Sequence, residues 1–461
     1  MGLSLDKQDI DYYQSIFKNK NVTNVELYDV SQSNSEHSRH WFFNGNYDIY
    51  LKSNEPKTCH FKKTDKVSLM QKIKSTNELA NNNSIIAFND NSSAIEGYPI
   101  DNIYPDENHQ YIISYEKLHP THTAETHNFP TGICPFPGAA TGTGGRIRDQ
   151  ISIGRGGKFV SGYVGYSVGK LFSDSEYPFK KPEEILIQAS NGASDYGNKI
   201  GEPIILGYTR SFGTGNLPFP NSRYEYVKPI MYSGGIGFIK DYNVKKGEVD
   251  LGQLVVRVGG PAYNIGLGGG SASSRNQDTQ NKALDFNAVQ RGDPQMENKA
   301  ARFIEICSNL EKNPIISVHD QGSGGMGNVT KEIMSPKGGI VTLNSVNLGE
   351  PDLSSNVIWN AEYQEQFTIL INHQDINLVK QIAKRENVKL EFVGVITNSG
   401  CVSVHNKNDA IETVVQFDLQ PVLDTIPTKK YKLYQEEESS LNNTSDNNSN
   451  NSDNNSDNGI E

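Results

Sequence analysis

Four short stretches of the chain carry polar side chains of the kinds that bind ligands or transfer protons. They are SNSEHSRHWFF, AETHNFPTG, the pair AVQRGDP and SVHDQGSGGMGN, and NAEYQEQF. The second stretch is followed closely by GAATGTGGRIRD, residues 138–149, which ends in Arg148 and Asp149. Arginine and backbone N–H groups hold phosphate, and carboxylate oxygens hold Mg²⁺. The segment from Glu125 to Asp149 therefore predicts a phosphorylated ligand that is bound together with a magnesium ion.

The glycine-rich run at 138–149 does not fit the familiar nucleotide-binding motifs. A P-loop needs a lysine after its last glycine, but Arg146 stands there. No run of Val and Ile leads directly into the glycines, as a dinucleotide-binding turn requires. The Gly and Pro residues from 130 onward favour a tight loop over a helix, and such a loop would present N–H groups to a ligand. A glycine-rich turn with incidental charges explains the composition equally well.

The other clusters allow a functional and a structural explanation each. His37 and His40 stand beside an aromatic run, where a histidine pair is often packed or hydrogen-bonded at the surface. Asp320 directly follows a buried strand, where a carboxylate is costly unless it is solvated, caps a helix or binds a cation. Glu362 and Gln364 alternate with aromatic residues in a pattern typical of a strand, half of which faces outwards.

Length and composition limit the classes of protein that fit. A chain of 461 residues is long enough for two or three domains. Its 43 Lys and Arg against 54 Asp and Glu give a net charge of -11, which argues against a nucleic-acid surface. The four cysteines form no C-x-x-C pair, which favours a reducing compartment. We find no signal peptide, lipid anchor or run of about 18 apolar residues, so we expect a cytoplasmic protein that does not contact a membrane.

The chain divides near residue 280, at SSRNQDTQNK. Glycine and short strands such as GQLVVRVGGP precede this point, whereas DPQMENKAARFIEICSNL after it predicts an amphipathic helix and PIISVHD a buried strand. We expect a layered α/β structure with one domain at 1–280, including a linker at 1–30, and a second at 281–430. The Asn, Ser and Asp residues at 436–461 predict a disordered tail.

Nine motifs together resemble phosphoribosylformylglycinamidine synthases of the large, eukaryotic type. They are SEHSRHWFF, AETHNFPTG, GAATGTGGRIRD at 138–149, ASNGASDYGNKIGEP, PIMYSGGIG, VGGPAYNIGLGGGSASS, LDFNAVQRGDPQME, SVHDQGSGGMGN and WNAEYQEQF. The similarity runs in unbroken order from about Leu3 to the strands near residue 405. It implies a PurM-like N-terminal A domain followed by an AIR-synthase C-terminal-like B domain, each a mixed sheet with helices.

The resemblance also implies an activity, in which ATP, Mg²⁺ and ammonia convert formylglycinamide ribonucleotide into the amidine for purine biosynthesis. The amide oxygen attacks the γ-phosphate, and ammonia then displaces the phosphate from the iminophosphate. His127 corresponds to the proposed catalytic histidine and His37 to a second active-site histidine. Mg²⁺ ligands correspond to Glu125, Asp149 and Asp320. Substrate positions correspond to Thr126, Asn128, Phe129, Arg148, Gln290, Glu362, Tyr363 and Gln364, although Phe129 cannot hydrogen-bond through its side chain. ATP contacts correspond to His40, Leu206, Gly207 and Tyr208 and to Gly138, Ala139, Ala140, Thr141, Gly142, Thr143, Gly144, Gly145, Arg146, Ile147, Arg148 and Asp149.

The sequence resembles only the first half of the family pattern. No second A/B pair follows residue 430, and no G-x-C-x-G motif supplies the activated cysteine that glutamine hydrolysis needs. We therefore expect ammonia to come from a separate glutaminase and the ATP pocket to be completed by the missing half or in a homodimer. Two alternatives remain open: an independent homodimeric ATP-dependent enzyme of the PurM superfamily, and a non-catalytic module that binds a ribonucleotide.

Overall fold

The computed structural model describes residues 3, 5–52, 59–65, 67–80, 83–106, 110–174, 176–215, 223–274, 282–407 and 411–436. The chain forms two compact units. The first comprises Met1–His40 and Thr76–Pro427, and the second comprises Trp41–Ser75 and Thr428–Glu461. The expected disordered tail lies outside the described residues from 437 onward, so it stays a prediction. No helix in the described part of the chain is long and apolar enough to cross a membrane.

The first unit contains two large mixed sheets, which the chain builds one after the other. The first sheet has the strand order β3-β4-β6-β11-β7-β8, and β5 also pairs with β6. Its strands are β3 (Ser84–Ile86), β4 (Ser93–Ile95), β5 (Tyr98–Pro105), β6 (Tyr111–Thr126), β7 (Lys158–Val168), β8 (Ile204–Ser211) and β11 (Ile230–Lys240). Only β7 and β8 are parallel, and the helix that connects them, α8 (Pro182–Ile200), makes the crossover that a parallel pair needs. A further hairpin joins β9 (Gly213–Gly215) to β10 (Arg223–Glu225).

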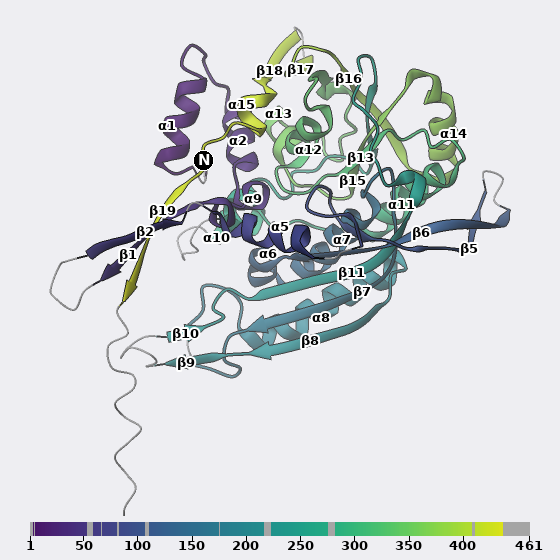
Figure 1. Cartoon of the computed structure of the whole chain (residues 1–461). Helices are drawn as coiled ribbons and strands as arrows, with labels where there is room; N and C mark the ends of the chain where they lie inside the picture. Colours follow the sequence, from purple (N-terminus) through teal and green to yellow (C-terminus); the bar gives the residue numbers. More distant parts are fainter. Residues whose placement is uncertain are drawn as a thin grey trace, which may run out of the picture. The chain divides into compact units, whose positions relative to one another are not determined.

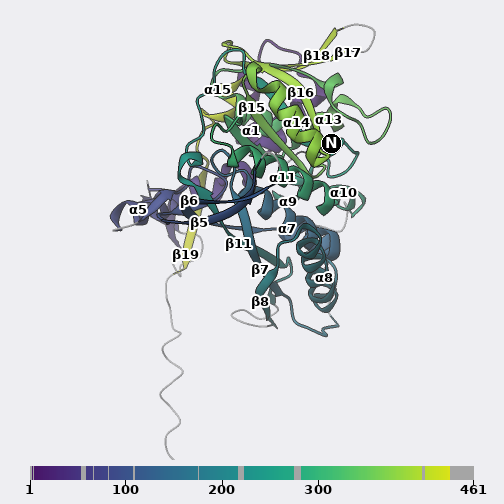
Figure 2. The same cartoon turned by 90° about the vertical axis from the view of Figure 1, so that its right-hand side faces the viewer.

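The helices α7 (Pro135–Ile151) and α8 cover one face of this sheet and leave the other face open (Figures 1 and 2). Glycines in α7 permit the close packing. A Cβ atom on Gly144 would lie 2.5 Å from the Tyr196 ring, and one on Gly142 would lie 2.6 Å from Cβ of His127. Because almost every residue of α7 is buried, this helix forms the centre of the first layer.

Residues 138–149 are therefore helical, and the expected tight loop is wrong. The backbone N–H of Gly138 already donates to Cys134 O, and the following residues continue the helical ladder. None of the four glycines in this run has a positive φ. Gly138, Gly142 and Gly144 are required for their small size and not for an unusual backbone conformation. This helical run therefore offers no cradle of free N–H groups.

The second sheet has the strand order β13-β15-β12-β16-β14-β17-β18. Its strands are β12 (Leu254–Gly259), β13 (Ser317–Asp320), β14 (Gly339–Thr342), β15 (Gln366–Ile371), β16 (Lys389–Ile396), β17 (Cys401–Lys407) and β18 (Ile411–Asp418). The expected division near residue 280 does not coincide with the division between the sheets, because β12 precedes that point and pairs with β15 and β16. The mixed α/β architecture predicted from the sequence is confirmed.

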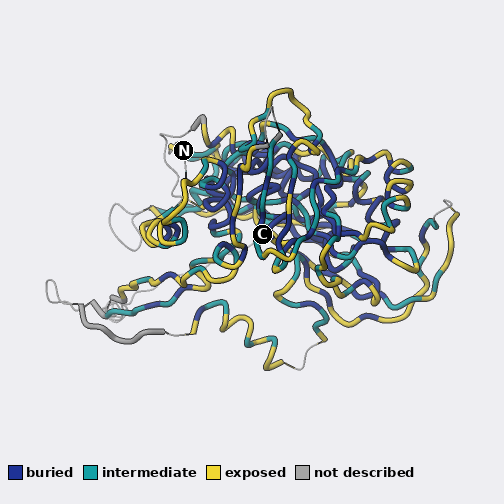
Figure 3. The backbone as a smooth tube through the Cα atoms, turned by 90° about the horizontal axis from the view of Figure 1, so that it is seen from above, coloured by how far each residue is buried: buried dark blue, intermediate teal, exposed yellow. Residues whose placement is uncertain are grey.

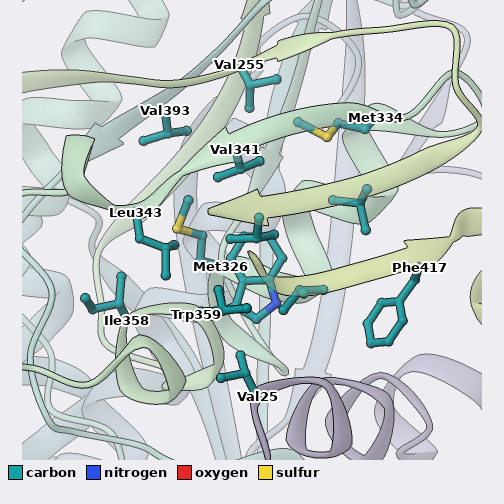
Figure 4. Close-up of a cluster of buried hydrophobic side chains, with 14 of the residues drawn as sticks. Val25, Val255, Met326, Met334, Val341, Leu343, Ile358, Trp359, Val393 and Phe417 are labelled. Atoms are coloured by element: carbon teal, nitrogen blue, oxygen red, sulfur yellow. The ribbon is translucent and has the colours of Figure 1, made fainter. Parts of the chain in front are cut away.

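Helices pack on this sheet with the apolar faces that their sequences predict. They are α11 (Pro294–Asn309), α12 (Gly325–Met334), α13 (Ser355–Asn360), α14 (Ile376–Glu386) and the short α15 (Leu419–Leu423). Ala300, Phe303, Ile304 and Cys307 of α11 are buried as expected, and Pro294 occupies the first turn. Trp359 belongs to a separate cluster of buried hydrophobic side chains, where it lies next to Met326 and Leu343 (Figure 4).

The stretch NAEYQEQF also differs from its prediction. Residues 361–367 are all buried, so no half of the pattern faces solvent. Residues 361–365 form the connection between α13 and β15 inside the molecule, and Gln366 and Phe367 begin β15, a buried strand. By contrast, the paired strands β5 and β6 extend outward at the right of Figure 3, where they are mostly exposed or half-buried.

Short N-terminal helices complete the first unit: α1 (Lys7–Ile16), α2 (Asn24–Ser33) and α3 (Glu36–Arg39). Both α1 and α2 begin with a capping box, made by Asp6 with Asp9 and by Thr23 with Glu26. In the second unit, β1 (Asn46–Lys52) pairs parallel to β19 (Lys430–Glu436) and antiparallel to β2 (Cys59–Asp65).

Candidate active site

Two aspartates, one from a helix and one from a strand, meet at one asparagine. Asp149 lies near the end of α7, and Asp320 is the last residue of β13. Asn91, in the loop between β3 and β4, donates from Nδ2 to Asp320 Oδ1 at 2.5 Å and to Asp149 Oδ1 at 3.3 Å. Ser152 Oγ also donates to Asp320, at 3.3 Å. The structure therefore brings together two of the three predicted Mg²⁺ ligands.

The third predicted ligand, Glu125, joins the same group from the end of β6. Its side chain shares a hydrogen bond with Asp149, which requires that one of the two carboxyl groups carry a proton. Loss of hydration and then the Asp320 charge raise the pKa of Glu125, and loss of hydration and then Glu125 raise the pKa of Asp149. Glu125 keeps exposed surface, so an ion from solution can reach it directly.

Arg148 is the guanidinium of this group, and both of its terminal nitrogens donate hydrogen bonds, whereas its buried Nε donates none to the residues described. It donates to Glu297 at 2.8 Å and to Gln364, and it lies 3.6 Å from Glu365. Its Nε lies 3.9 Å from Asp320 Oδ2. The carboxylates raise the pKa of Arg148 against the effect of burial, so this side chain stays charged.

Carboxyl groups outnumber cations in this part of the molecule. The group contains five acidic side chains around Arg148: Glu125, Asp149, Glu297, Asp320 and Glu365. Burial raises the pKa of Glu297 to about 7 and that of Glu365 to about 8, in both cases against the opposing effect of Arg148. One guanidinium cannot neutralise five carboxylates, so the group must bind protons or another cation.

The donor set suits a hard divalent cation, because it consists of carboxylates with an amide close by. No group of three His, Cys, Asp or Glu side chains within the described ranges already has the spacing of a metal site. The carboxylates instead share a proton and the amide of Asn91. A cation of this kind would replace that proton and relieve the repulsion between the acids.

His127 lies next to this group, immediately after β6. Its Nδ1 lies 2.5 Å from Gly138 O, and a carbonyl only accepts, so Nδ1 carries the proton and Nε2 is free to accept one. Loss of hydration lowers the pKa of His127 to about 4, and His37 and Arg148 contribute to this shift. The side chain is therefore neutral near pH 7 and has the protonation state of a general base.

The Gln290 amide connects His127 to a second acidic group. It lies beside the His127 ring, and its Nε2 donates to Glu362. Backbone N–H groups of Gly270 and Gly324 also donate to Glu362, at 2.9 and 3.0 Å. Oε1 of Gln290 is buried, and apart from the His127 ring beside it, it has no hydrogen-bond partner in the described part of the chain. An unpaired buried acceptor beside the histidine favours a ligand that donates a hydrogen bond there.

His37 approaches the same region from α3. Its Nε2 lies 2.6 Å from Oγ of Ser273, which belongs to α9 (Gly269–Ser274). A positive charge on His37 lowers the pKa of His127. A positive charge on His40, at the end of α3, lowers the pKa of His37 in the same way. His37 is thus close enough to influence His127, although ninety positions of the sequence separate the two.

Several predicted site residues do not face this group. Leu206 and Tyr208 lie on the open face of the first sheet, on its edge strand β8, whereas Glu125 lies on the face covered by α7. Tyr363 is buried in the core, and its hydroxyl donates to Ile358 O. Phe129 packs against α9 and cannot contact a ligand through a polar group. Thr126 follows Glu125 on the strand and so points to the open face.

Four participants were not predicted from the sequence. Glu297 sits in the buried stripe of an amphipathic helix, where an acid is a recognisable anomaly. Asn91 and Tyr196 have no comparable pattern, yet the Tyr196 hydroxyl lies within hydrogen-bond distance of both Glu297, at 2.5 Å, and Glu365, at 2.9 Å. Lys228 stands two residues before β11 and donates to Ser273 O at 3.0 Å.

Similarity to known proteins provides independent evidence on the relationships of this chain. Residues 251–406 match the AIR synthase related protein C-terminal domain, and residues 1–40 match the formylglycinamide ribonucleotide amidotransferase linker domain. The chain is 45% identical to phosphoribosylformylglycinamidine synthase of Dictyostelium discoideum over 95% of its own length, and 42% identical to the Homo sapiens protein of that name. Almost the whole chain is therefore similar to one segment of the phosphoribosylformylglycinamidine synthases. It covers 33% and 34% of these two relatives, so it spans about a third of the family protein.

Solved structures agree on the fold. T. maritima PurL complexed with FGAR superposes with a TM-score of 0.60 at 21% identity, over 90% of this chain and 55% of that one. T. maritima PurL complexed with ATP gives a TM-score of 0.57 at 19% identity. At this identity the likeness shows that the PurL fold is shared, and the ligands named belong to the T. maritima protein.

Proposed function

We propose that this chain supplies the ribonucleotide-binding and magnesium-binding part of a phosphoribosylformylglycinamidine synthase. The observation that carries the proposal is the meeting of Glu125, Asp149 and Asp320, from separate elements, beside a neutral His127. The reaction would be the ATP-dependent amidation of formylglycinamide ribonucleotide. The family relation supports this substrate, and the excess of carboxylates supports the metal.

The residues present fit distinct parts of this chemistry. Glu125, Asp149 and Asp320 would hold Mg²⁺, and Asn91 would keep two of these carboxylates in place. When bound, the ion would neutralise charge on the transferring phosphoryl group. His127 Nε2 would take the proton that the substrate amide loses as its oxygen becomes nucleophilic. Gln290 Oε1 would accept a hydrogen bond from the ribonucleotide.

The role of ATP needs more than this part of the family protein. The predicted ATP residues Leu206 and Tyr208 lie on the open face of the first sheet, away from the carboxylates. That face also carries a row of adjoining rings, from His122 and Tyr163 to Tyr232. We propose that the rest of the synthase, or a second copy of the chain, covers this face and completes the ATP site. Ammonia would come from a separate glutaminase. A cytoplasmic location also stays a proposal, since the Arabidopsis thaliana relative is named chloroplastic/mitochondrial.

Isothermal titration calorimetry with formylglycinamide ribonucleotide tests the binding function directly. We expect the purified chain to bind it and Gln290→Leu to weaken binding by roughly tenfold, the effect of one lost hydrogen bond in a closed site. Gln188→Leu on the exposed side of α8 is the control and should bind normally. Absence of binding to the unaltered chain would contradict the proposal. ADP release in the presence of Mg-ATP and ammonia would show in addition that the chain acts alone.

A further inference from the structure

Lys228 is a half-buried lysine without an acidic partner. Its Nζ donates to Ser273 O at 3.0 Å and forms no ion pair with any residue that the structure describes. Loss of hydration lowers the pKa of Lys228, and no acidic side chain opposes that effect. Two other lysines with a lowered pKa behave differently, because Lys240 pairs with Glu116 and Lys331 with Asp29. An ammonium group that is partly removed from water and has no counter-ion favours an anionic ligand.

The groups around Lys228 also favour an anionic ligand. Ser273, whose carbonyl accepts from Lys228, also presents its hydroxyl at 2.6 Å from His37 Nε2. The Lys228 charge lowers the pKa of His37, and His37 in turn affects His127. An ammonium, a hydroxyl and an imidazole thus meet at Ser273 of α9. The Ser273 hydroxyl already donates to Gly270 O at 3.1 Å, so the Lys228 ammonium is the main donor available to an anion here.

Geometry explains how the chain brings these groups together. Lys228 leads into β11, and Met231 of this strand makes two hydrogen bonds with the segment that starts α6 (Asn128–Ile133). His127 N donates to Met231 O at 2.9 Å, and Met231 N donates to the side-chain Oδ1 of Asn128 at 3.0 Å. The lysine is therefore fixed to the same backbone segment as the proposed base. A side chain on this anchor keeps its position relative to His127 when a ligand binds.

We propose that Lys228, with Ser273 and His37, binds a phosphoryl group of the reactants. This role is the one that a P-loop lysine has in other nucleotide-dependent enzymes, and residues 138–149 cannot supply it because they form a helix without a lysine. The proposal rests on the proposed function. The phosphoryl group belongs either to ATP or to the ribonucleotide, since both carry the same chemical group.

Calorimetry on the full chain separates these sources. Titrations with formylglycinamide ribonucleotide, with the corresponding riboside that lacks phosphate, and with Mg-ATP are compared for the unaltered chain, Lys228→Met, Lys228→Arg and Ser273→Ala. We expect Lys228→Met to weaken one phosphate-bearing ligand by about 10- to 100-fold and to leave the riboside unchanged. The ligand that loses affinity identifies the source. Lys228→Arg should recover most of the loss, because it restores the charge.

Lys199→Met is the matched control, because Lys199 pairs with Asp195 on the exposed side of α8. Far-ultraviolet circular dichroism of each variant verifies folding, and Ser273→Ala should show a smaller loss for the same ligand. If the unaltered chain binds either phosphate ligand and Lys228→Met binds both equally well, the inference is wrong while the proposed function stands. If the unaltered chain binds neither ligand, both are wrong.

Discussion

His127 shows how burial prepares a single residue for chemistry. Its Nδ1 proton is directed to Gly138 O, and loss of hydration lowers its pKa to about 4. The same shift costs the folded protein stability in acid, since the unfolded chain binds a proton near the ordinary histidine pKa of about 6.5 while the folded chain does not.

The first prediction concerns this proton. Between pH 6.5 and about 4 the unfolded state carries more protons at position 127, so the free energy of unfolding should fall as the pH falls through this window. The difference in unfolding free energy between the unaltered chain and His127→Gln should therefore change by roughly 2 kcal/mol from pH 7 to pH 4.5, in the direction that favours the variant in acid. Urea unfolding at several pH values measures it. If the unfolding free energies of the two proteins changed equally with pH, the lowered pKa of His127 would be contradicted.

The second prediction concerns Asp149. Replacing it with Asn removes one charge from a group in which acids outnumber cations, so Asp149→Asn should stabilise the metal-free chain. Mg²⁺ should raise the melting temperature of the unaltered chain more at pH 8 than at pH 6, because the raised pKa of the carboxyl groups means that protons compete with the ion. The variant should lose this response. Equal Mg²⁺ responses in both proteins would exclude Asp149 as a ligand.

At the scale of elements, the glycines of α7 determine how closely layers can approach. Gly144 leaves room for the Tyr196 ring, and Tyr196 in turn holds Glu297 and Glu365. Packing in the first layer therefore contributes directly to the positions of the acidic side chains next to Arg148.

The third prediction uses two neighbouring glycines. A Cβ at Gly144 would lie 2.5 Å from Tyr196, so Gly144→Ala should lower the free energy of unfolding by about 1–3 kcal/mol. Gly145 has its nearest atoms at 3.5 and 3.6 Å, so Gly145→Ala should be neutral or stabilise the helix by up to about 1 kcal/mol. Urea unfolding of both variants provides the comparison. If both substitutions destabilised the protein equally, the contact with Tyr196 would not be the reason for a glycine at position 144.

The elements after residue 280 could be predicted because their apolar periodicity is strong. The helix α11 and the strand β13 fall where the pattern places them. The run at 138–149 could not be predicted, because Gly and Ala permit both a loop and a tightly packed helix, and the choice depends on α8 and on the sheet. Likewise, the sequence contains Asp149 and Asp320 but gives no indication of Asn91, which connects them only after both sheets have formed.

At the scale of the whole molecule, the first sheet has a face that no helix within the described residues covers. Leu206 is 68% exposed on β8, and Ile236 is 47% exposed on β11. The chain spans about a third of its curated relatives, and the partner proposed above for this face is the remainder of such a protein. Exposed apolar surface of this kind promotes association.

The fourth prediction concerns that face. In the absence of the remaining two thirds of the family protein, we expect the chain to self-associate as its concentration rises, and Leu206→Glu to reduce the association by introducing a charge on the face. Light scattering after size-exclusion chromatography reports the mass. Leu251→Glu, at another exposed apolar residue outside this sheet, serves as the control and should associate as the unaltered chain does. A monomer at all concentrations would contradict the proposed contact.

The binding of one divalent cation by Glu125, Asp149 and Asp320 is the central claim, and anomalous diffraction from crystals containing Mn²⁺ tests it most directly. Mn²⁺ accepts the same oxygen ligands as Mg²⁺ and scatters anomalously. We predict a peak within about 2.0–2.4 Å of carboxylate oxygens from at least two of these residues, with His127 nearby. An empty site between these carboxylates, in crystals that show bound Mn²⁺ elsewhere, would contradict the account.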